Sequence, residues 1–399
     1  MRLRSYLRLL EDARPVVRTL RQAYGTPQPS ETPPYEREQA RQVTDRLHPG
    51  WIVVRVVRIR VETLCTRTLV LKARRGALPA FAPGQYVNVF VEVRGVRTSR
   101  PMSISAPPRA DGTMELTIKR KPGGFVSEHL VDHLKVGDAL AVSGPEGDLP
   151  FQPARDGKDL VFIAAGSGVT PFMGMLEDLA RRWPEVRLAL LYGSRTAEAI
   201  IFRDRLEALA RRGRLRLRHA VSRPSLGWAG ERGRIDPPML RRFLHGESLD
   251  GKTFFVCGPP ELDRTVTRAL EAAGVPGGRI RAESSGSPEA ITGRSDWPVG
   301  LRANQVFMVR IEGHAAPIAA RAGEPLLSSL ERAGLSVPVL CRSGVCGSCR
   351  TRLTEGAVVR SVRAGQRASE SAAGYIHACV SHPVSDLRVA LLPASPRVP

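Results

Sequence analysis

The chain has 399 residues, of which 42% are apolar and 25% charged, a composition that excludes a disordered or fibrous protein and allows two or three domains. The 60 basic residues exceed the 39 acidic ones, and the net charge of +21 would attract an acidic protein, an anionic membrane or a nucleic acid. The sequence has no run of 18 apolar residues, no signal-peptide pattern and no nucleic-acid-binding motif, so we expect a cytoplasmic protein without a nucleic-acid partner.

Residues 1–48 are predicted to form an N-terminal extension. In residues 1–24, apolar side chains recur at steps of three and four among several arginines, which predicts a basic amphipathic helix. Such a helix either packs its apolar stripe on its own protein or lies peripherally on a membrane surface, and the sequence leaves both open. The Pro-containing stretch 25–36 predicts a linker, and a short polar helix is expected to end near His48.

From Trp51 the sequence changes to strand-like segments separated by Pro and Gly turns. Five such segments precede one short helix at residues 128–134, and a sixth follows it, which predicts a small antiparallel β-barrel over residues 49–153. From Asp159 strands and helices alternate, including a helix around residues 237–244, and this pattern predicts a doubly wound parallel sheet over residues 154–285. A linker at 286–304 and a compact α+β unit at 305–399 complete the multidomain chain.

Four of the six cysteines are grouped in the last unit as C-x4-C-x2-C-x29-C. Two sulfide-bridged irons need four thiolates on a tight loop, and the Gly and Ser residues between these cysteines let backbone amides approach the sulfurs. Zinc is the alternative, but its sites usually pair two C-x2-C knuckles or add His. The spacing and the closing stretch GYIHACVSHPVSDL resemble a plant-type [2Fe–2S] ferredoxin domain, which implies a β-grasp fold. The implied cluster ligands are Cys341, Cys346, Cys349 and Cys379.

Two motifs in the predicted barrel suit a flavin. Arg100-Pro101-Met102-Ser103 lies on a predicted strand, and Gly123-Gly124 stands shortly before Ser127, which can cap the helix at residues 128–134. The free amides of that helix and the charge of Arg100 would favour a phosphate. Either motif taken alone has an ordinary structural explanation, a helix cap or a surface ion pair.

Two further motifs follow strands of the predicted parallel sheet. The first, Gly166-Ser167-Gly168-Val169-Thr170-Pro171, opens a helix after the strand LVFIA, where glycines let the backbone approach a dinucleotide pyrophosphate. The second, Cys257-Gly258-Pro259, ends the strand TFFVC at the same sheet edge, where open α/β sheets bind ligands. The alternative for Cys257 is an ordinary buried thiol.

The order of these motifs resembles the ferredoxin–NADP reductase family, and with the cluster domain attached the chain is similar to reductases of bacterial multicomponent oxygenases, such as the phenylacetyl-CoA and phthalate types. The resemblance implies that Ser103 bonds near flavin N5 and that Cys257 lies near the reactive nicotinamide carbon; these two are the catalytic candidates. The cofactor-binding candidates are Arg100, Pro101, Met102, Ser103, Gly123, Gly124, Ser127, Gly166, Ser167, Gly168, Thr170, Pro171, Arg195, Ser222, Arg223, Arg234, Cys257, Gly258 and Pro259.

The chain departs from the resembled families in three respects. Met102 stands where the reductases usually have a Tyr stacked on the flavin, and Glu283 at the end of the nicotinamide domain is followed by Ser284 rather than an aromatic residue. From Asn304 onward 11 Arg stand against six acidic residues, whereas soluble ferredoxins are usually acidic. The flavin is expected to be FAD by the family's usual practice, with FMN as the alternative.

The predicted function is that of an NAD(P)H-dependent flavin and iron–sulfur oxidoreductase. Hydride would pass from the nicotinamide to the flavin, and electrons would then pass through a [2Fe–2S] cluster to a separate oxygenase, hydroxylase, desaturase or P450 component. Ser222, Arg223 and Arg234 match positions that hold the 2′-phosphate in NADP-using relatives, and Arg195 is a further candidate, which favours NADPH over NADH. The alternative is a non-catalytic electron-transfer or redox-sensing subunit that binds flavin and cluster without nicotinamide.

Overall fold

The computed structural model describes residues 51–284, 291–360 and 365–392. The predicted helix at 1–24, the predicted linker at 25–36 and the polar helix expected to end near His48 lie outside the described residues. Within the described part, no helix is both long and apolar enough to cross a membrane.

The first sheet is antiparallel and has six strands in the order β4-β3-β6-β1-β2-β5. Its strands are β1 (Ile52–Thr63), β2 (Thr66–Ala73), β3 (Tyr86–Val93), β4 (Val96–Ser103), β5 (Thr113–Lys119) and β6 (Ala139–Val142). A bridge between Ile104 and Leu116 joins the end of β4 to β5 and closes the sheet, so the predicted antiparallel barrel is confirmed. Alternation drives this fold, because Val54 and Val56 are fully buried while Arg55 between them is exposed.

The helix predicted at residues 128–134 is a single five-residue turn, η1 (His129–His133). The Ser127 cap expected for it is absent, since η1 has no side-chain cap hydrogen bond. The Ser127 hydroxyl instead accepts a hydrogen bond from the Lys121 amide at 3.0 Å, across the Gly123-Gly124 turn. The prediction of a cap was therefore wrong, because the turn before the helix competes for the same oxygen.

The second sheet is parallel, with the strand order β10-β9-β8-β7-β11-β12. Its strands are β7 (Asp159–Ala165), β8 (Arg187–Ser194), β9 (Arg216–Val221), β10 (Glu231–Arg232), β11 (Lys252–Gly258) and β12 (Ile280–Ser284). The chain builds outward from β7 through β8 and β9, then returns to place β11 on the other side of β7. The strand order therefore reverses between β7 and β11, which is where such sheets bind ligands.

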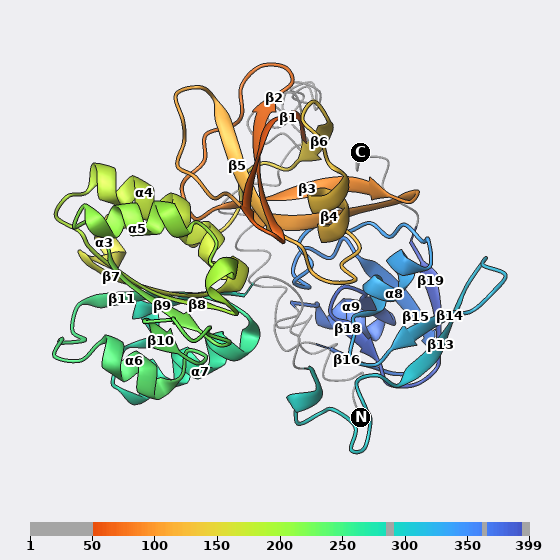
Figure 1. Ribbon diagram of the computed structural model, residues 1–399. Coiled ribbons are helices and arrows are strands. Elements are labelled where there is room, and N and C mark those ends of the chain that lie inside the picture. The colour runs from red at the N-terminus through yellow and green to blue at the C-terminus, as the bar shows by residue number, and fades with distance from the viewer. Residues whose placement is uncertain (1–50, 285–290, 361–364, 393–399) are drawn as a thin grey trace, which may run out of the picture. The chain divides into compact units, whose positions relative to one another are not determined.

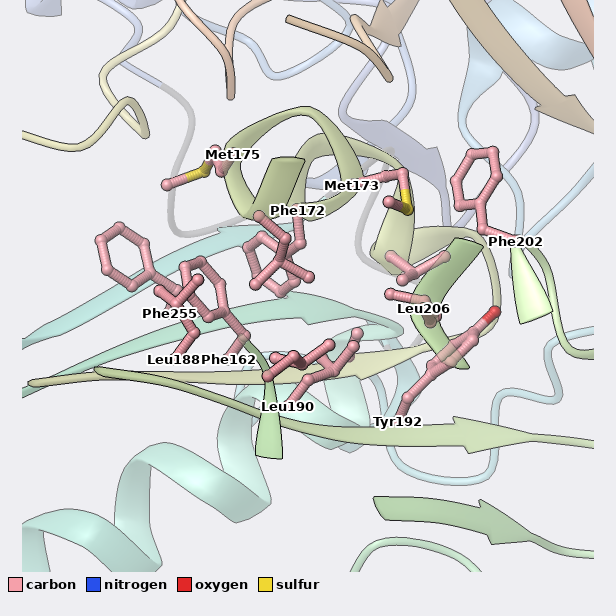
Figure 2. Close-up of a cluster of buried hydrophobic side chains, with 14 of the residues drawn as sticks. Phe162, Phe172, Met173, Met175, Leu188, Leu190, Tyr192, Phe202, Leu206 and Phe255 are labelled. Atoms are coloured by element: carbon pink, nitrogen blue, oxygen red, sulfur yellow. The ribbon is translucent and has the colours of Figure 1, made fainter. Parts of the chain in front are cut away.

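Helices cover both faces of the parallel sheet, as predicted (Figure 1). These are α4 (Thr170–Arg182) and α5 (Arg203–Arg211) on one face and α6 (Pro237–Phe243) and α7 (Pro260–Ala272) on the other, with the short α3 (Pro153–Asp156) before β7. Figure 2 shows the core under α4 and α5, where Phe162 of β7 meets Phe255 of β11 with ring centroids 4.9 Å apart and Phe172 of α4 at 5.0 Å. These aromatic contacts join the two strands that flank the reversal of strand order to the helix that follows β7.

The third sheet is mixed and has the order β14-β13-β19-β15-β17. Its strands are β13 (Val306–Ile311), β14 (Ile318–Arg321), β15 (Arg350–Glu355), β17 (Tyr375–His377) and β19 (Leu387–Leu391); β16 (Val358–Arg360) pairs separately with β18 (Ser381–Pro383), and the helices are α8 (Leu326–Arg332) and α9 (Ala368–Ala372). The last strand lies in the middle beside β13, and α8 contributes three fully buried leucines to the core. This is the β-grasp arrangement that the ferredoxin resemblance implied.

The described part of the predicted linker 286–304 is packed rather than extended. The turn η5 (Ile291–Gly293) buries Ile291, and Trp297 lies with it in a small core against Ala322 and Val359. The indole N–H of Trp297 donates to the Leu301 carbonyl at 2.9 Å. The predicted domain boundaries stay predictions, and this segment packs against residues just after β14 and in β16.

Candidate functional site

The four predicted cluster ligands lie together in the third unit. Three of them are on the loop between α8 and β15, and Cys379 follows β17. Backbone amides of Ser343 and Cys346 donate to the Cys341 sulfur at 3.5 and 3.4 Å. Amides that point at sulfur stabilise thiolates and sulfide clusters. The loop therefore fits the [2Fe–2S] cluster that the cysteine spacing predicts.

The four thiols form two pairs. Cys341 shares a hydrogen bond with Cys346, and Cys349 shares one with Cys379. In each pair the bond lowers the pKa of the accepting thiol, Cys341 or Cys349, and raises that of its partner. Among the described residues no group of three or more His, Cys, Asp or Glu side chains is arranged to hold one metal ion. Two thiol pairs are the donor set that a two-iron cluster needs.

The buried side chain of His377 contacts the loop that carries three of the cysteines. It is 1% exposed, and its Nδ1 lies 2.7 Å from the Gly344 carbonyl, with Nε2 3.4 Å from a carboxylate oxygen of Glu370. Gly344 has φ +78°, a left-handed conformation that only glycine adopts readily. The contacts of the histidine with Gly344 and Glu370 indicate a structural role in the loop.

The two nicotinamide motifs are in direct contact across β7 and β11. The first forms the turn η2 (Gly166–Val169) and the start of α4, where Pro171 occupies the first turn. A Cβ on Gly168 would lie 2.1 Å from the Cys257 carbonyl oxygen, and one on Gly258 would lie 3.2 Å from the Ala165 amide nitrogen. Each motif therefore needs glycine because the backbone of the other occupies the space.

Two residues outside the predicted set act on the first nicotinamide loop. The hydroxyl of the fully buried Tyr192 donates to the Gly166 carbonyl at 2.9 Å and accepts from the Ile201 amide at 3.3 Å. Lys119 of β5 brings its ammonium to 3.6 Å from the place where Gly166 would carry a Cβ. From the sequence, Lys119 is only a basic residue at the end of a predicted strand. That position does not show which loop the side chain faces.

Cys257 lies beside Glu283, a residue that was not on the predicted list. The two are register partners in β11 and β12. Burial, followed by the nearby acidic charges, raises the pKa of the Cys257 thiol, so the thiol is neutral. Burial also raises the pKa of the Glu283 carboxyl to about 7, and its Oε2 is buried with no hydrogen-bond partner among the described residues. A buried carboxyl with a perturbed pKa marks a candidate functional position.

An aromatic residue, Tyr86, lies beside the predicted flavin motif on the neighbouring strand β3. Tyr86 pairs in register with Ser103 of β4, and its hydroxyl donates to Glu146 at 3.2 Å. Burial first, and then the charge of Glu146 and the hydrogen bond to it, raise the pKa of the Tyr86 hydroxyl. Met102 is half-buried against the barrel core.

Arg100 faces the iron–sulfur unit in this structure. Its guanidinium bonds to Glu331 at 3.0 Å and to Thr98 and the Ser99 carbonyl at 3.0 and 2.8 Å. A cavity of about 610 Å³ lies between the Gly123 turn, η1 and Arg332. Its lining includes Arg120 together with the carboxylates of Glu128 and Asp132 to which Arg120 is paired. The assignment of Arg100 and Ser127 to the flavin phosphate stays a prediction.

The four candidates for a 2′-phosphate gather at the ends of β8 to β10. The Ser222 amide donates to the Ser194 carbonyl at 3.0 Å and the Arg223 amide to the Arg195 carbonyl at 2.8 Å, which sets the two loops side by side. Arg234 is paired with Glu261 at 3.2 Å. Arg195 and Arg223 are exposed and have no ion pair among the described residues, so their charges are available to a ligand.

Three family models match the chain in the predicted order. They are the oxidoreductase FAD-binding domain at residues 60–151, the oxidoreductase NAD-binding domain at 162–268 and the 2Fe-2S iron-sulfur cluster binding domain at 309–384. These matches confirm FAD, a nicotinamide dinucleotide and a [2Fe–2S] cluster as the cofactors and decide against zinc.

Whole-chain relatives have the same organisation. The chain is 30% identical over 355 residues to the glycine betaine monooxygenase reductase subunit of Pseudomonas aeruginosa (strain UCBPP-PA14), covering 85% of this chain and 94% of that one. It is 30% identical over 314 residues to one of the subunits of the 1,2-phenylacetyl-CoA epoxidase of Escherichia coli (strain K12), covering 76% and 86%. The solved structure of phthalate dioxygenase reductase matches 86% of this chain and 98% of that one, with 25% identity and a TM-score of 0.60.

Proposed function

Since the chain belongs to the family of flavin- and iron–sulfur-containing oxidoreductases that includes these reductase subunits, we propose that it is the reductase component of an oxygenase system. It oxidises NADPH, and electrons leave through the cluster to a separate oxygenase, hydroxylase, desaturase or P450 protein. The flavin, when bound, accepts hydride and releases electrons one at a time. The protein supplies placement and charge, and the proposal needs no side-chain nucleophile.

One observation carries this proposal. The barrel that carries the flavin motif contacts both other units. The Nε of Arg342, the residue after the candidate ligand Cys341, donates to the Ser99 carbonyl of β4 at 2.7 Å. The Lys119 ammonium of β5 lies 3.6 Å from the place where Gly166 would carry a Cβ. These contacts support a flavin site between the nucleotide loop and the cluster loop, as an electron path through a flavin requires.

The proposed roles combine the family resemblance with the contacts. Ser103 would donate to the flavin near N5, and the neutral Cys257 thiol would lie near the nicotinamide ring, as the resemblance implies. Lys119 and the loop at Gly166 hold the nucleotide pyrophosphate, since both present positive or donor groups to the same space. Glu283 retains a proton up to a pH of about 7 because of its burial.

We also propose NADPH as the preferred donor. Arg195 and Arg223 are exposed at the strand ends, and each can meet a phosphate with a charge-assisted bond. The bond between the Arg223 amide and the Arg195 carbonyl holds the two chain segments together. Arg234 contributes less, because Glu261 already neutralises it.

An anaerobic visible titration tests the proposal. Stepwise NADPH is expected to bleach both the flavin and the cluster bands, and NADH to require a higher concentration. Cluster bands that stay oxidised while the flavin bleaches would contradict the internal path. Flavin and cluster bands that ignore both nucleotides would favour the non-catalytic electron-transfer subunit instead.

A peripheral membrane contact through residues 1–24 remains a separate hypothesis, motivated by their basic amphipathic pattern. Co-sedimentation with anionic liposomes would be compared for the full chain and for residues 49–399. Stronger binding of the full chain is expected, and equal binding of the two would refute a membrane role for this segment.

A further inference from the structure

A buried carboxylate of the iron–sulfur unit lies against the strand that carries the flavin motif. Glu331, in the last turn of α8, is 2% exposed. It accepts bonds from Thr98 and Arg100 of β4 and from Arg342, the residue after the cluster ligand Cys341. One side chain thus connects the flavin strand to the cluster loop.

Further bonds run along the same contact. The Arg342 Nε donates to the Ser99 carbonyl at 2.7 Å, and the Ser99 hydroxyl donates to the Val339 carbonyl at 2.8 Å. The Arg97 amide donates to the Ser336 hydroxyl at 3.0 Å. Backbone and side-chain hydrogen bonds therefore fix the segment before the cluster loop to β4. The bonded residues follow one another in the same order along both segments.

The charges at this contact are unequal. Two guanidinium groups, those of Arg100 and Arg342, share the single carboxylate of Glu331. Without that carboxylate two partly buried cations would face each other, and their repulsion would act directly on the contact. With it, one positive charge remains unbalanced beside the flavin motif.

The backbone at Arg342 shows that the contact constrains the cluster loop. Arg342 has φ +54°, in the left-handed region that residues other than glycine seldom occupy. Such a conformation persists where surrounding bonds over-determine it, and Arg342 has bonds to Glu331, Thr98 and the Ser99 carbonyl. The strained residue is adjacent to Cys341, so a change in its bonds would move a cluster ligand.

We propose that Glu331 is a positioning residue for electron transfer inside the chain. By binding Arg100 and Arg342 together, it docks the cluster loop on the flavin strand and sets the distance across which electrons pass. This inference rests on the proposed function for its kinetic consequence, whereas the docking itself does not require turnover.

The test uses the full holoprotein and the variant Glu331→Gln, which keeps the shape of the side chain and removes its charge. In anaerobic stopped-flow experiments with NADPH, the bleaching of the flavin is expected to stay within about twofold of the wild-type rate. The later reduction of the cluster is expected to slow at least about tenfold, because a buried charge pair loses one partner. Glu355→Gln, on the same unit and paired with Arg388, is the matched control and is expected to change neither step.

A second readout does not depend on activity. Hydrogen exchange at the Arg97 amide, which is bonded to Ser336, is expected to accelerate in Glu331→Gln while amides of β13 and β15 keep their protection. Thr98→Val, which removes the hydroxyl between the charges, is expected to shift both readouts in the same direction by a smaller factor.

The outcomes separate the possible failures. Unchanged cluster reduction together with unchanged exchange at Arg97 would overturn the positioning role. Loss of protection throughout β13 and β15 in both variants would assign Glu331 to folding of its own unit and would equally overturn it. A wild-type protein whose flavin ignores NADPH would refute the proposed function, while accelerated Arg97 exchange in the variant would still support the docking.

Discussion

Replacing Gly168 by Ala should separate the two nicotinamide loops. The new methyl group would lie 2.1 Å from the Cys257 carbonyl oxygen, 2.4 Å from its carbon and 2.7 Å from the Gly258 nitrogen. Ordinary contacts begin near 3.4 Å, so one loop must move by about 1.3 Å. No flexible side chain can yield here, because all three atoms are backbone. We expect a cost of roughly 1–3 kcal/mol in the free energy of unfolding.

The functional loss should exceed the loss of stability. A displacement of about 1 Å at a reacting centre can lower a rate by about 100-fold, and Cys257 lies beside the proposed position of the nicotinamide ring. The assay is the NADPH-dependent rate of flavin bleaching under anaerobic conditions, with the flavin content measured for each variant. Gly166→Ala provides a graded comparison, because its Cβ would approach only the Lys119 ammonium at 3.6 Å and its cost comes from φ +56°, about 1–2 kcal/mol.

Gly277→Ala is the matched control, since no atom lies within 4 Å of its new methyl group and its φ is ordinary. It is expected to behave as the wild type in both stability and rate. A Gly168→Ala protein that bleaches its flavin at the wild-type rate and with the wild-type KM for NADPH would refute the close contact between the loops at η2 and β11.

Three further predictions concern the nucleotide, the cluster and a buried acid. Arg223→Gln is expected to raise the KM for NADPH about tenfold without changing that for NADH, in steady-state assays with Arg212→Gln as control; equal changes for both nucleotides would count against a 2′-phosphate contact. Cys349→Ser should abolish the cluster's visible absorption while Cys65→Ser, a half-buried cysteine outside the cluster loop, retains it; a Cys349→Ser protein with a full spectrum would contradict the ligand assignment. The pKa of Glu283 is raised from 4.5 to about 7 in the folded protein, so its contribution to stability is present below pH 4.5 and is lost as pH rises to about 7, by up to roughly 3 kcal/mol. Urea unfolding at pH 5 and 8 should show a smaller decline for Glu283→Gln than for the wild type, and identical declines would refute the shift.

The cysteine ligands were predictable because their evidence is local. Three of the four lie within nine residues, and the spacing that a two-iron cluster requires is written directly in the chain. The alternation of buried valines in β1 predicted a barrel strand for the same reason, since side-chain period is a property of neighbouring residues. The two nucleotide motifs were recognised by composition, as glycines after strands.

Other parts of the site depend on strand pairings between residues far apart in the sequence, and these pairings could not be predicted from it. Glu283 became a candidate only because β12 pairs with β11 and buries its carboxyl beside Cys257. Tyr86 lies beside the flavin motif only because β3 sets it opposite Ser103. The predicted Ser127 cap is absent because the Ser127 hydroxyl accepts a hydrogen bond from the nearby Lys121 amide instead.

The sequence by itself determined the order of the three cofactor-binding units and indicated four candidate thiols for the cluster, because both follow from spacing along the chain and hydrophobic period. The tertiary structure alone decided what those units do to one another. It brought the backbone of Gly168 against that of Cys257. It also placed Glu331 between two arginines, Arg100 and Arg342, that are more than 200 residues apart in the chain. Such contacts arise from packing and the neutralisation of buried charge, and these forces act through space rather than along the sequence.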